Sequence, residues 1–316
     1  MSGSSGSRRG SNVLDLLERD DPSTSCVYSN KGKMLFKLGS RGNDAGNFTW
    51  PRGVAVGHGA LSRSEIVVAD SSNHRVQIFD QNGHFLNEFG SYGSEPGEFD
   101  CLAGVAINRY TKNYIVSDRY NHRIQVFDMT GRFVRSFGEF GRDQGKFNLP
   151  WGVACDSRTG TIYVCDKENH RIQVFDVDGT CVNKFGSNGS QAAQLQHPHY
   201  IAVGLGRVVV TDTNNHRIQL FDLSGRLIKT IGHEGSGRGE FKFPRGVAMD
   251  EAGYMVVGDS GNNRLQIFSP EGKYIKSIGT WGSGEGEFKG IEGVALDSWN
   301  NNILVCDREN HRIQVF

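Results

Sequence analysis

Short apolar runs rich in β-forming residues alternate with polar turn sequences along most of the chain. In one stretch the run Gly53–Val56 is followed by Ile66–Asp70, by the alternating segment Arg75–Asp80, and, after Gly83, by Phe85–Gly90. Such runs, spaced about 8 to 12 residues apart and bounded by Gly, Asn and Asp, are typical of antiparallel strands. The pattern predicts a unit of four strands, which we name a to d in chain order.

This unit recurs along the chain. An Asn-His-Arg triplet opens the third strand of each copy, with Asn263 in place of histidine in the fifth copy, and its arginines are Arg75, Arg123, Arg171, Arg217, Arg264 and Arg312. The steps between these arginines are 48, 48, 46, 47 and 48 residues. Four-stranded units with such a period pack radially in β-propellers, so six units predict an all-β, six-bladed β-propeller. An open solenoid is the alternative.

The two ends of the repeat array favour the propeller. The sixth unit stops at Phe316, after its third strand, whereas the segment Tyr28–Gly39 resembles Phe268–Gly279, a fourth strand. An N-terminal strand that completes the last blade would close the ring, and an open solenoid has no use for complementary half-units. We therefore expect a propeller over residues 26–316, preceded by a flexible leader, rich in Ser, Gly and Arg, over residues 1–25.

Composition adds limits to this picture. The 42 glycines and only 7 prolines indicate many tight turns, and 35 basic against 35 acidic residues leave no net charge, so any binding of a polyanion requires a local patch. No apolar run is long enough for a membrane span or a signal peptide, so we expect a cytoplasmic protein without membrane contact. The six cysteines form no C-x-x-C pair; we interpret them as buried thiols, with disulfides or reactive thiols as alternatives.

An aspartate lies five residues before each repeated arginine. These are Asp70, Asp118, Asp166, Asp212, Asp259 and Asp307. Since aspartate ends strand b and arginine opens strand c, the hairpin can pair them. A metal or acid–base site is the functional alternative, but catalysis needs one asymmetric constellation, whereas these groups recur in every unit. We therefore expect them to be scaffold.

The repeated segment, as in Asn121–Phe127, resembles the NHL repeat, and six copies resemble the NHL domain that ends the TRIM-NHL proteins. The resemblance covers residues 26–316. It implies a propeller that binds RNA in several family members, often single-stranded and U-rich, and docks protein partners in others. Ubiquitin ligation belongs to upstream zinc-binding domains whose Cys/His arrays are not in this sequence, so we expect no ligase activity in this chain and a monomeric propeller.

Enzymatic function is an alternative, because some six-bladed propellers are metal-dependent enzymes that use histidines lining the central channel. Only His197 and His199 form a local pair, and no third ligand or carboxylate stands at a recognisable spacing. No G-x-S-x-G elbow or phosphate-binding loop occurs in context. We expect no enzymatic activity, no metal and no cofactor.

Function is expected at positions that vary between blades on one face. The connector that enters strand a and the turn between strands b and c emerge at the same end of a blade. The basic and aromatic residues at these positions are Arg52, Arg119, Tyr120, Trp151, Lys167, His199, Tyr200, Arg245 and Arg308; the acidic ones are Glu168, Glu292 and Glu309. Interleaved cations and rings favour single-stranded RNA as the partner, with protein docking through the same residues as the alternative.

Overall fold

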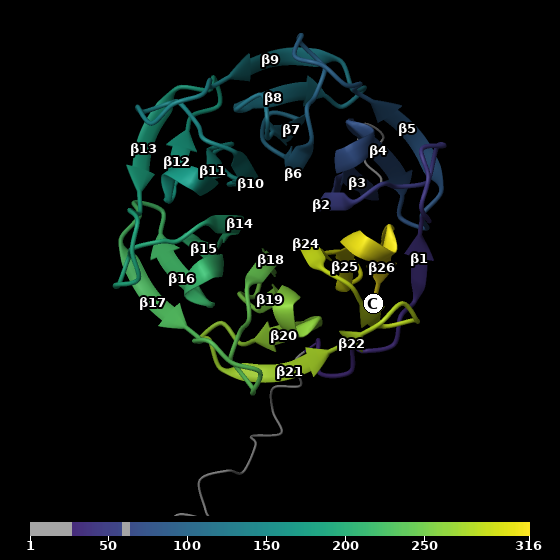
Figure 1. Cartoon of the computed structure of the whole chain (residues 1–316), viewed down its shortest axis with the longest axis vertical. Coiled ribbons are helices and arrows are strands. Elements are labelled where there is room, and N and C mark those ends of the chain that lie inside the picture. The colour runs from purple at the N-terminus through teal and green to yellow at the C-terminus, as the bar shows by residue number, and fades with distance from the viewer. Residues whose placement is uncertain (1–26, 59–63) are drawn as a thin grey trace, which may run out of the picture.

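The computed structural model describes residues 27–58 and 64–316 and shows a ring of six antiparallel sheets around a central axis (Figure 1). Each sheet has four strands, and neighbouring sheets are related by the repeat that the sequence contains. The predicted six-bladed β-propeller is thus confirmed. The leader expected over residues 1–25 lies outside the described residues.

Blades 1 to 5 each take their four strands from one continuous segment. Blade 1 contains β2 (Pro51–His58), β3 (Ser64–Asp70), β4 (Arg75–Asp80) and β5 (Phe85–Phe89); blade 2 contains β6 (Leu102–Asn108), β7 (Asn113–Asp118), β8 (Arg123–Asp128) and β9 (Phe133–Phe137). Blade 3 contains β10 (Pro150–Cys155), β11 (Ile162–Asp166), β12 (Arg171–Phe175) and β13 (Cys181–Phe185). Blade 4 contains β14 (Pro198–Gly204), β15 (Arg207–Asp212), β16 (Arg217–Asp222) and β17 (Leu227–Ile231), and blade 5 contains β18 (Pro244–Met249), β19 (Met255–Asp259), β20 (Arg264–Phe268) and β21 (Tyr274–Ile278).

Blade 6 closes the ring with strands from both ends of the array. It contains β24 (Ile291–Asp297), β25 (Asn302–Asp307), β26 (Arg312–Val315) and, as its outer strand, β1 (Phe36–Leu38). In the antiparallel pairing of β1 with β26, Phe36 is opposite Val315 and Leu38 is opposite Ile313. The predicted closure is therefore confirmed, and the solenoid alternative is wrong.

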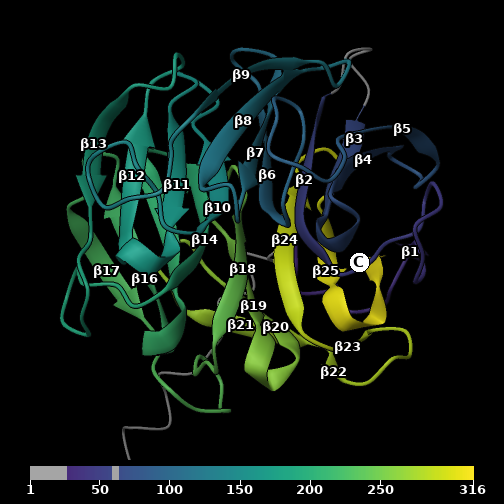
Figure 2. The same cartoon turned by 45° about the horizontal axis from the view of Figure 1, so that its top comes forward.

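Short 3₁₀ turns join strands b and c in five blades. They are η2 (Ser71–Asn73), η3 (Lys167–Asn169), η4 (Thr213–Asn215), η5 (Ser260–Asn262) and η6 (Arg308–Asn310), and residues 119–122 form the corresponding turn of blade 2. Figure 2 shows these turns at the same end of the blades, which we call the turn face. A short parallel pair, β22 (Thr280–Trp281) and β23 (Glu287–Phe288), lies in the connector that enters blade 6.

The core lies between adjacent blades rather than inside any one of them. One apolar cluster joins Val54 and Phe79 of blade 1 with Leu304 and Ile313 of blade 6, and similar clusters fill the other interfaces. The innermost strands approach so closely that a Cβ atom on Gly53 would lie 2.6 Å from the carbonyl oxygen of Ala103. Glycine at this position is therefore a packing requirement in five blades, whereas blade 4 has Tyr200 there.

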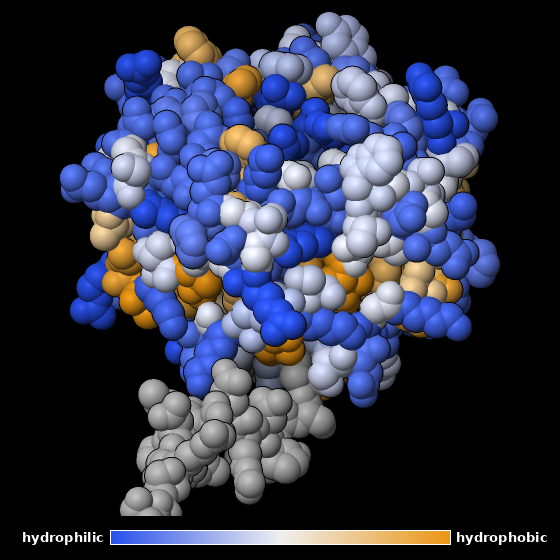
Figure 3. Space-filling model, turned by 60° about the horizontal axis from the view of Figure 1, so that its bottom comes forward, coloured by the Kyte–Doolittle hydropathy of each residue, from blue (hydrophilic) through white to orange (hydrophobic). Residues whose placement is uncertain are grey.

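The outer surface is largely polar. The side of the ring in view in Figure 3 is mostly hydrophilic, and its hydrophobic residues lie in separate groups. Among the described residues, no helix has the length and apolar character that a membrane span requires. The five described cysteines are free thiols, so no disulfide joins them; Cys165 and Cys306 are buried as expected, whereas Cys101, Cys155 and Cys181 are only half-buried.

Candidate functional site

The repeated Asp, Asn, Arg and Gln residues form one buried hydrogen-bond network in each blade. In blade 3, Oδ2 of Asp166 accepts hydrogen bonds from Arg171 Nε at 2.7 Å, Asn169 Nδ2 at 2.9 Å and Gln173 Nε2 at 3.1 Å. Nη2 of Arg171 also donates to the carbonyl of Lys146 in the incoming connector, at 3.0 Å. Burial raises the pKa of Asp166, and these donors oppose that rise.

The network ties each connector to its own blade. All six aspartate–arginine pairs are made, with Nε–Oδ2 distances between 2.7 and 3.0 Å and aspartate side chains that are 0% exposed. The pairing predicted from the five-residue offset is therefore present in every blade. In all six networks both oxygens of the aspartate already accept hydrogen bonds, which supports their role as scaffold.

The repeated histidines join neighbouring blades. Each of the five adopts a left-handed conformation, and its Nδ1 accepts a backbone N–H from the next connector: His74 from Cys101, His122 from Leu149, His170 from His197, His216 from Phe243, and His311 from Trp50, at 3.1 to 3.3 Å. In the fifth copy, Oδ1 of Asn263 takes the same role toward Gly290, at 3.4 Å. The histidine thus acts as an acceptor and requires the proton on Nε2.

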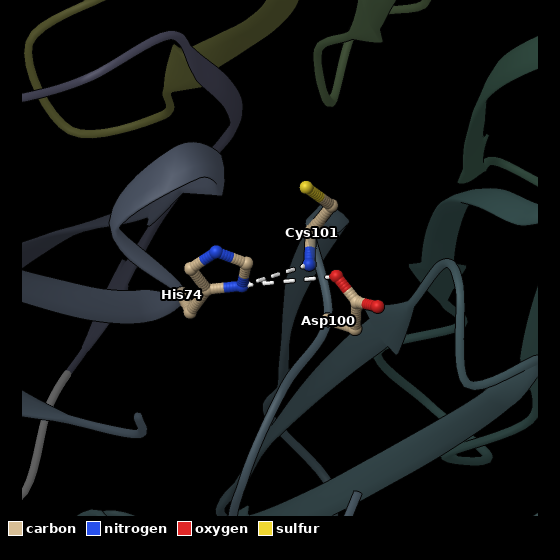
Figure 4. Close-up of side chains that lie close together, drawn as sticks. All are labelled: His74, Asp100 and Cys101. Atoms are coloured by element: carbon tan, nitrogen blue, oxygen red, sulfur yellow. Dashed lines mark hydrogen bonds and ion pairs between the residues drawn. The ribbon is translucent and has the colours of Figure 1, made fainter. Parts of the chain in front are cut away.

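His74, Asp100 and Cys101 lie close enough together to be considered as metal ligands (Figure 4). Nδ1 of His74, however, accepts the Cys101 backbone N–H at 3.2 Å and lies 4.0 Å from Asp100 Oδ1. The same contact from Nδ1 to the next connector occurs in four other blades, which lack this cysteine and carboxylate. We therefore assign His74 to the inter-blade contacts.

The residues proposed from sequence converge on Glu292, which lies on β24 and is fully buried. Arg52 of β2 donates to Glu292 Oε1 at 3.1 Å, Arg308 of η6 donates to it at 3.3 Å, and Arg245 of β18 also pairs with it. Oε2 of Glu292 and Nε of Arg245 and Arg308 are buried without a hydrogen-bond partner. Three arginines that sequence analysis treated as free cations are therefore already paired with one carboxylate.

A second group surrounds Trp151 of β10, next to the first. The Arg119, Arg52 and Lys167 cations lie 4.6, 5.0 and 5.4 Å from the centre of the indole ring. His199 packs edge-on against the same ring at 4.9 Å, and burial followed by the Arg245 charge lowers its pKa well below the usual range. We call the eight residues of these two groups the channel mouth; they are Arg52, Arg119, Trp151, Lys167, His199, Arg245, Glu292 and Arg308.

Tyr200 lies beneath this mouth and is only 7% exposed. Its hydroxyl donates to the carbonyl oxygen of Arg52 at 2.9 Å, so the side chain reaches from β14 to β2 on the opposite side of the ring (Figure 1). Trp151 is also buried, at 4% exposure. Contrary to the sequence-based expectation, neither ring offers an open face on which a base could stack.

Exposed rings surround the mouth at positions that sequence analysis missed. Together with Tyr120, they form what we call the aromatic rim: Trp50, Tyr92, Tyr120, Phe140, Phe243 and Trp281. Tyr120 is 45% exposed and lies 4.2 Å from the Arg119 guanidinium, while Tyr92 packs edge-on against His74. The missed rings lie in the connectors, directly before a glycine or before the residues that open strand a. Comparing connectors between blades would have identified them.

The other end of the channel is different. A cavity of about 330 Å³ opens there. Its walls include Ile107, Val203, Met249 and Leu296 from the ends of strands a. Arg109 of blade 2 approaches Glu251 of blade 5 at 4.0 Å across this opening. The opening is thus apolar inside and charged at its edge, whereas the channel mouth is charged throughout.

The fold and the repeats define a class of protein, the six-bladed β-propellers, and the chain matches a family of that description over residues 60–136. It also matches the NHL repeat over residues 147–175, 195–221, 241–268 and 288–316. The chain therefore belongs to the NHL-repeat propellers, and the resemblance to the TRIM-NHL proteins is confirmed.

Relatives with known names match part of the chain. RING finger protein nhl-1 of Caenorhabditis elegans is 47% identical over 79 residues, which are 25% of this chain and 8% of that protein. Protein brain tumor of Drosophila melanogaster is 39% identical over 85 residues, 26% of this chain and 8% of that protein. The matched segments thus span less than a tenth of these relatives.

Solved structures share the fold at low identity. A streptogramin B lyase superimposes with a TM-score of 0.61 at 13% identity, over 89% of this chain and 96% of that chain. A gluconolactonase from Xanthomonas campestris superimposes with a TM-score of 0.62 at 14% identity, over 90% of this chain and 96% of that chain. These similarities concern the architecture alone.

Proposed function

We propose that the turn face binds single-stranded RNA and that the chain is a non-enzymatic recognition module acting in post-transcriptional regulation in the cytoplasm. The observation that supports this most directly is the aromatic rim, a set of exposed rings on the same face as the four arginines and the lysine of the channel mouth. Bases stack on exposed rings with little regard to sequence, while cations bind the phosphates.

The residues divide into those that touch RNA and those that hold them in place. Arg119 and Lys167 lie beside Trp151 and bind phosphates, and Tyr120 provides a stacking surface next to Arg119. Arg52, Arg245 and Arg308 share Glu292, and Arg308 also pairs with Glu309, so these arginines are held in place while part of their charge is already neutralised. Trp151, His199 and Tyr200 form the floor that supports this arrangement.

Binding of short single-stranded RNAs, measured over a range of salt concentrations, tests the proposal. Tyr120→Ala should cost about 1 to 3 kcal/mol of binding free energy, as loss of one stacking ring typically does. Tyr110→Ala is the matched control, because Tyr110 is similarly exposed, at 60%, but follows β6 at the opposite end of the blade. Charge reversal at Arg132, next to the turn between β8 and β9, should likewise leave affinity nearly unchanged.

Protein docking is the second candidate, since Tyr, Trp and Arg also dominate protein interfaces. RNA binding predicts affinity that depends on sequence and falls as salt rises. If the wild type binds RNA weakly and without sequence dependence at moderate salt, or if Tyr110→Ala weakens binding as much as Tyr120→Ala, the RNA proposal is wrong. The rim would then be assigned to a protein partner.

A further inference from the structure

A comparison of equivalent connectors reveals an empty position in blade 3. Tyr92, Phe140 and Asn188 occupy the same place, since each forms the isolated bridge that precedes strand a of the following blade. The Tyr92 ring packs against His74 at 4.8 Å, and the Phe140 ring packs against His122 at 4.9 Å. In blade 3 the connector supplies the His197 ring, which packs edge-on against His170 at 4.6 Å, but at the place of Tyr92 and Phe140 it has only the short side chain of Asn188.

A cavity opens where the ring is missing. Its volume is about 300 Å³, and its lining residues are Arg142, Glu168, Asn169, His170, Arg171 and Asn188. It lies at the turn face, since Glu168 and Asn169 belong to η3. The sister blades show that a flat, six-membered ring fits beside this histidine without disturbing the fold.

The polar groups of the cavity differ in how far they are already engaged. Oδ1 of Asn169 is buried without a hydrogen-bond partner, although Nδ2 of the same side chain donates to Asp166 and to the carbonyl of Gly141. Arg171 is committed to Asp166 and the connector. Arg142 is exposed, and its charge acts on His170, so its guanidinium lies near the opening. Asn169 Oδ1 inside the cavity can therefore accept a hydrogen bond from a ligand, and the Arg142 guanidinium at its edge can donate one.

We propose that this cavity takes one RNA base beside His170, with the base donating an N–H to Asn169 Oδ1 and accepting from Arg142. All four bases can make both contacts, because uracil and guanine present an N–H next to a carbonyl, and cytosine and adenine present an amino group next to a ring nitrogen that accepts. The cavity therefore selects for a base rather than for one particular base. The inference rests on the proposed RNA binding of the turn face. Lys167 of η3 is paired with the neighbouring Glu168, so a phosphate of the same strand would compete with that carboxylate for the Lys167 ammonium group.

Asn188→Phe tests the proposal by giving blade 3 the residue that blade 2 already has. The backbone is suited to it, because Gly141 and Gly189, which follow the two residues, have φ of 158° and 149°. The variant should unfold at the wild-type temperature, since the added ring packs as Phe140 does, yet bind single-stranded RNA about tenfold or more weakly. Asn188→Ala leaves the cavity open and should keep affinity within about twofold of wild type.

Glu234→Phe, at the equivalent position of blade 4, controls for an added surface ring and should also keep wild-type affinity. If Asn188→Phe is stable and retains full affinity, the pocket assignment is wrong while RNA binding by the face stands. If the wild type shows no sequence-dependent RNA binding, the proposed function itself fails. The two failures are therefore distinguishable.

A second measurement does not depend on the folding of any variant. NMR signals of the His170 imidazole in the wild type should shift on addition of nucleoside 5′-monophosphates and much less with ribose 5-phosphate, which lacks the base. A larger shift with N-acetyltyrosinamide than with any nucleotide would assign the cavity to an aromatic side chain of a protein partner and overturn the proposal.

Discussion

Two sets of arginines occupy the turn face side of this propeller and behave differently. The six repeated arginines, such as Arg217, are paired with a buried aspartate and with connector carbonyls. At the channel mouth, Arg52, Arg245 and Arg308 share Glu292, and Arg119 has no carboxylate partner but lies over the rings of Tyr120 and Trp151. The first set is saturated, and the second retains unpartnered N–H groups.

The difference shows that residue type alone does not separate scaffold from site. The N–H groups of an arginine that bonds one carboxylate and two carbonyls are already used in hydrogen bonds within the fold. Three arginines around one carboxylate, by contrast, leave an excess of positive charge. The scaffold arginines recur in every blade, whereas the arginines of the channel mouth occupy positions that differ from blade to blade. The hydrogen-bond partners and the burial of each arginine distinguish the scaffold arginines from those of the channel mouth.

Opening the ring is the most severe test of the scaffold. A chain that starts at residue 40 lacks β1, so the outer edge of β26 and the apolar surface under Leu38 are left uncovered. We expect aggregation or the loss of most of the unfolding free energy, measured by thermal and urea denaturation. Removal of residues 1–20 serves as the control and should change nothing. Cooperative melting of the shorter chain at the intact temperature would contradict this account.

Removing a repeated arginine should be the next largest effect. Arg217→Ala leaves the buried Asp212 carboxylate without its charged partner, which typically costs about 3 to 5 kcal/mol of unfolding free energy. By contrast, Arg119→Ala should lower stability by no more than about 2 kcal/mol, the usual size of a partly desolvated cation–π contact, and weaken RNA binding. Urea denaturation and RNA titration of both variants would reveal whether the two sets of arginines truly differ.

Glu292→Gln probes the shared carboxylate. The substitution keeps the shape but removes the charge, so up to about 3 kcal/mol of stability should be lost as the charge-assisted hydrogen bonds weaken. The three released arginines should strengthen RNA binding and steepen its salt dependence by about one unit. Weaker RNA binding would mean that orientation of the arginines by Glu292 matters more than their free charge.

The smallest effect concerns pH. Burial lowers the pKa of His122, His170 and His311 below the ordinary value of 6.5. Their Nδ1 atoms accept backbone N–H groups, so protonation would also break these contacts. As the pH falls, these histidines therefore take up protons in the unfolded chain at a higher pH than in the folded chain. Their contribution to stability is complete above pH 6.5 and should decline as the pH falls through and below that value.

The measurement is the unfolding temperature between pH 7.5 and 5.5. A variant with His122→Asn and His311→Asn should lose less on acidification, because Asn263 performs the same role in blade 5 without titrating. An identical pH dependence in that variant would show that other groups are responsible.

Much of the fold could be predicted because it is repeated. The arginine period fixed the number of blades, the incomplete sixth unit indicated the closure by Phe36–Leu38, and the five-residue offset indicated the aspartate–arginine pairs. Each of these depends on local spacing or on complementarity of two segments, which a single sequence contains.

The site was predicted less well because it depends on side chains that meet across the ring. Glu292 was recognised only as one acid among three, since nothing local shows that β2, β18 and η6 bring arginines to it. Tyr200 was expected on the RNA-binding face, but it is buried and its hydroxyl donates to the carbonyl of a residue 148 positions away. The cavity beside His170 becomes visible only when three connectors are compared in space.

Tyr200 has a mechanical consequence. Five blades keep glycine at this position and can move outward independently, within the limits of their neighbours, but the Tyr200 side chain spans the ring and links blade 4 to the Arg52 carbonyl of blade 1. That diameter should be the stiffest of the three, so the collective expansion of the ring becomes elliptical rather than circular. Thermal fluctuations of the channel mouth would then be largest in the blades away from this strut, blades 2, 3, 5 and 6, which supply Arg119, Trp151, Arg245 and Glu292.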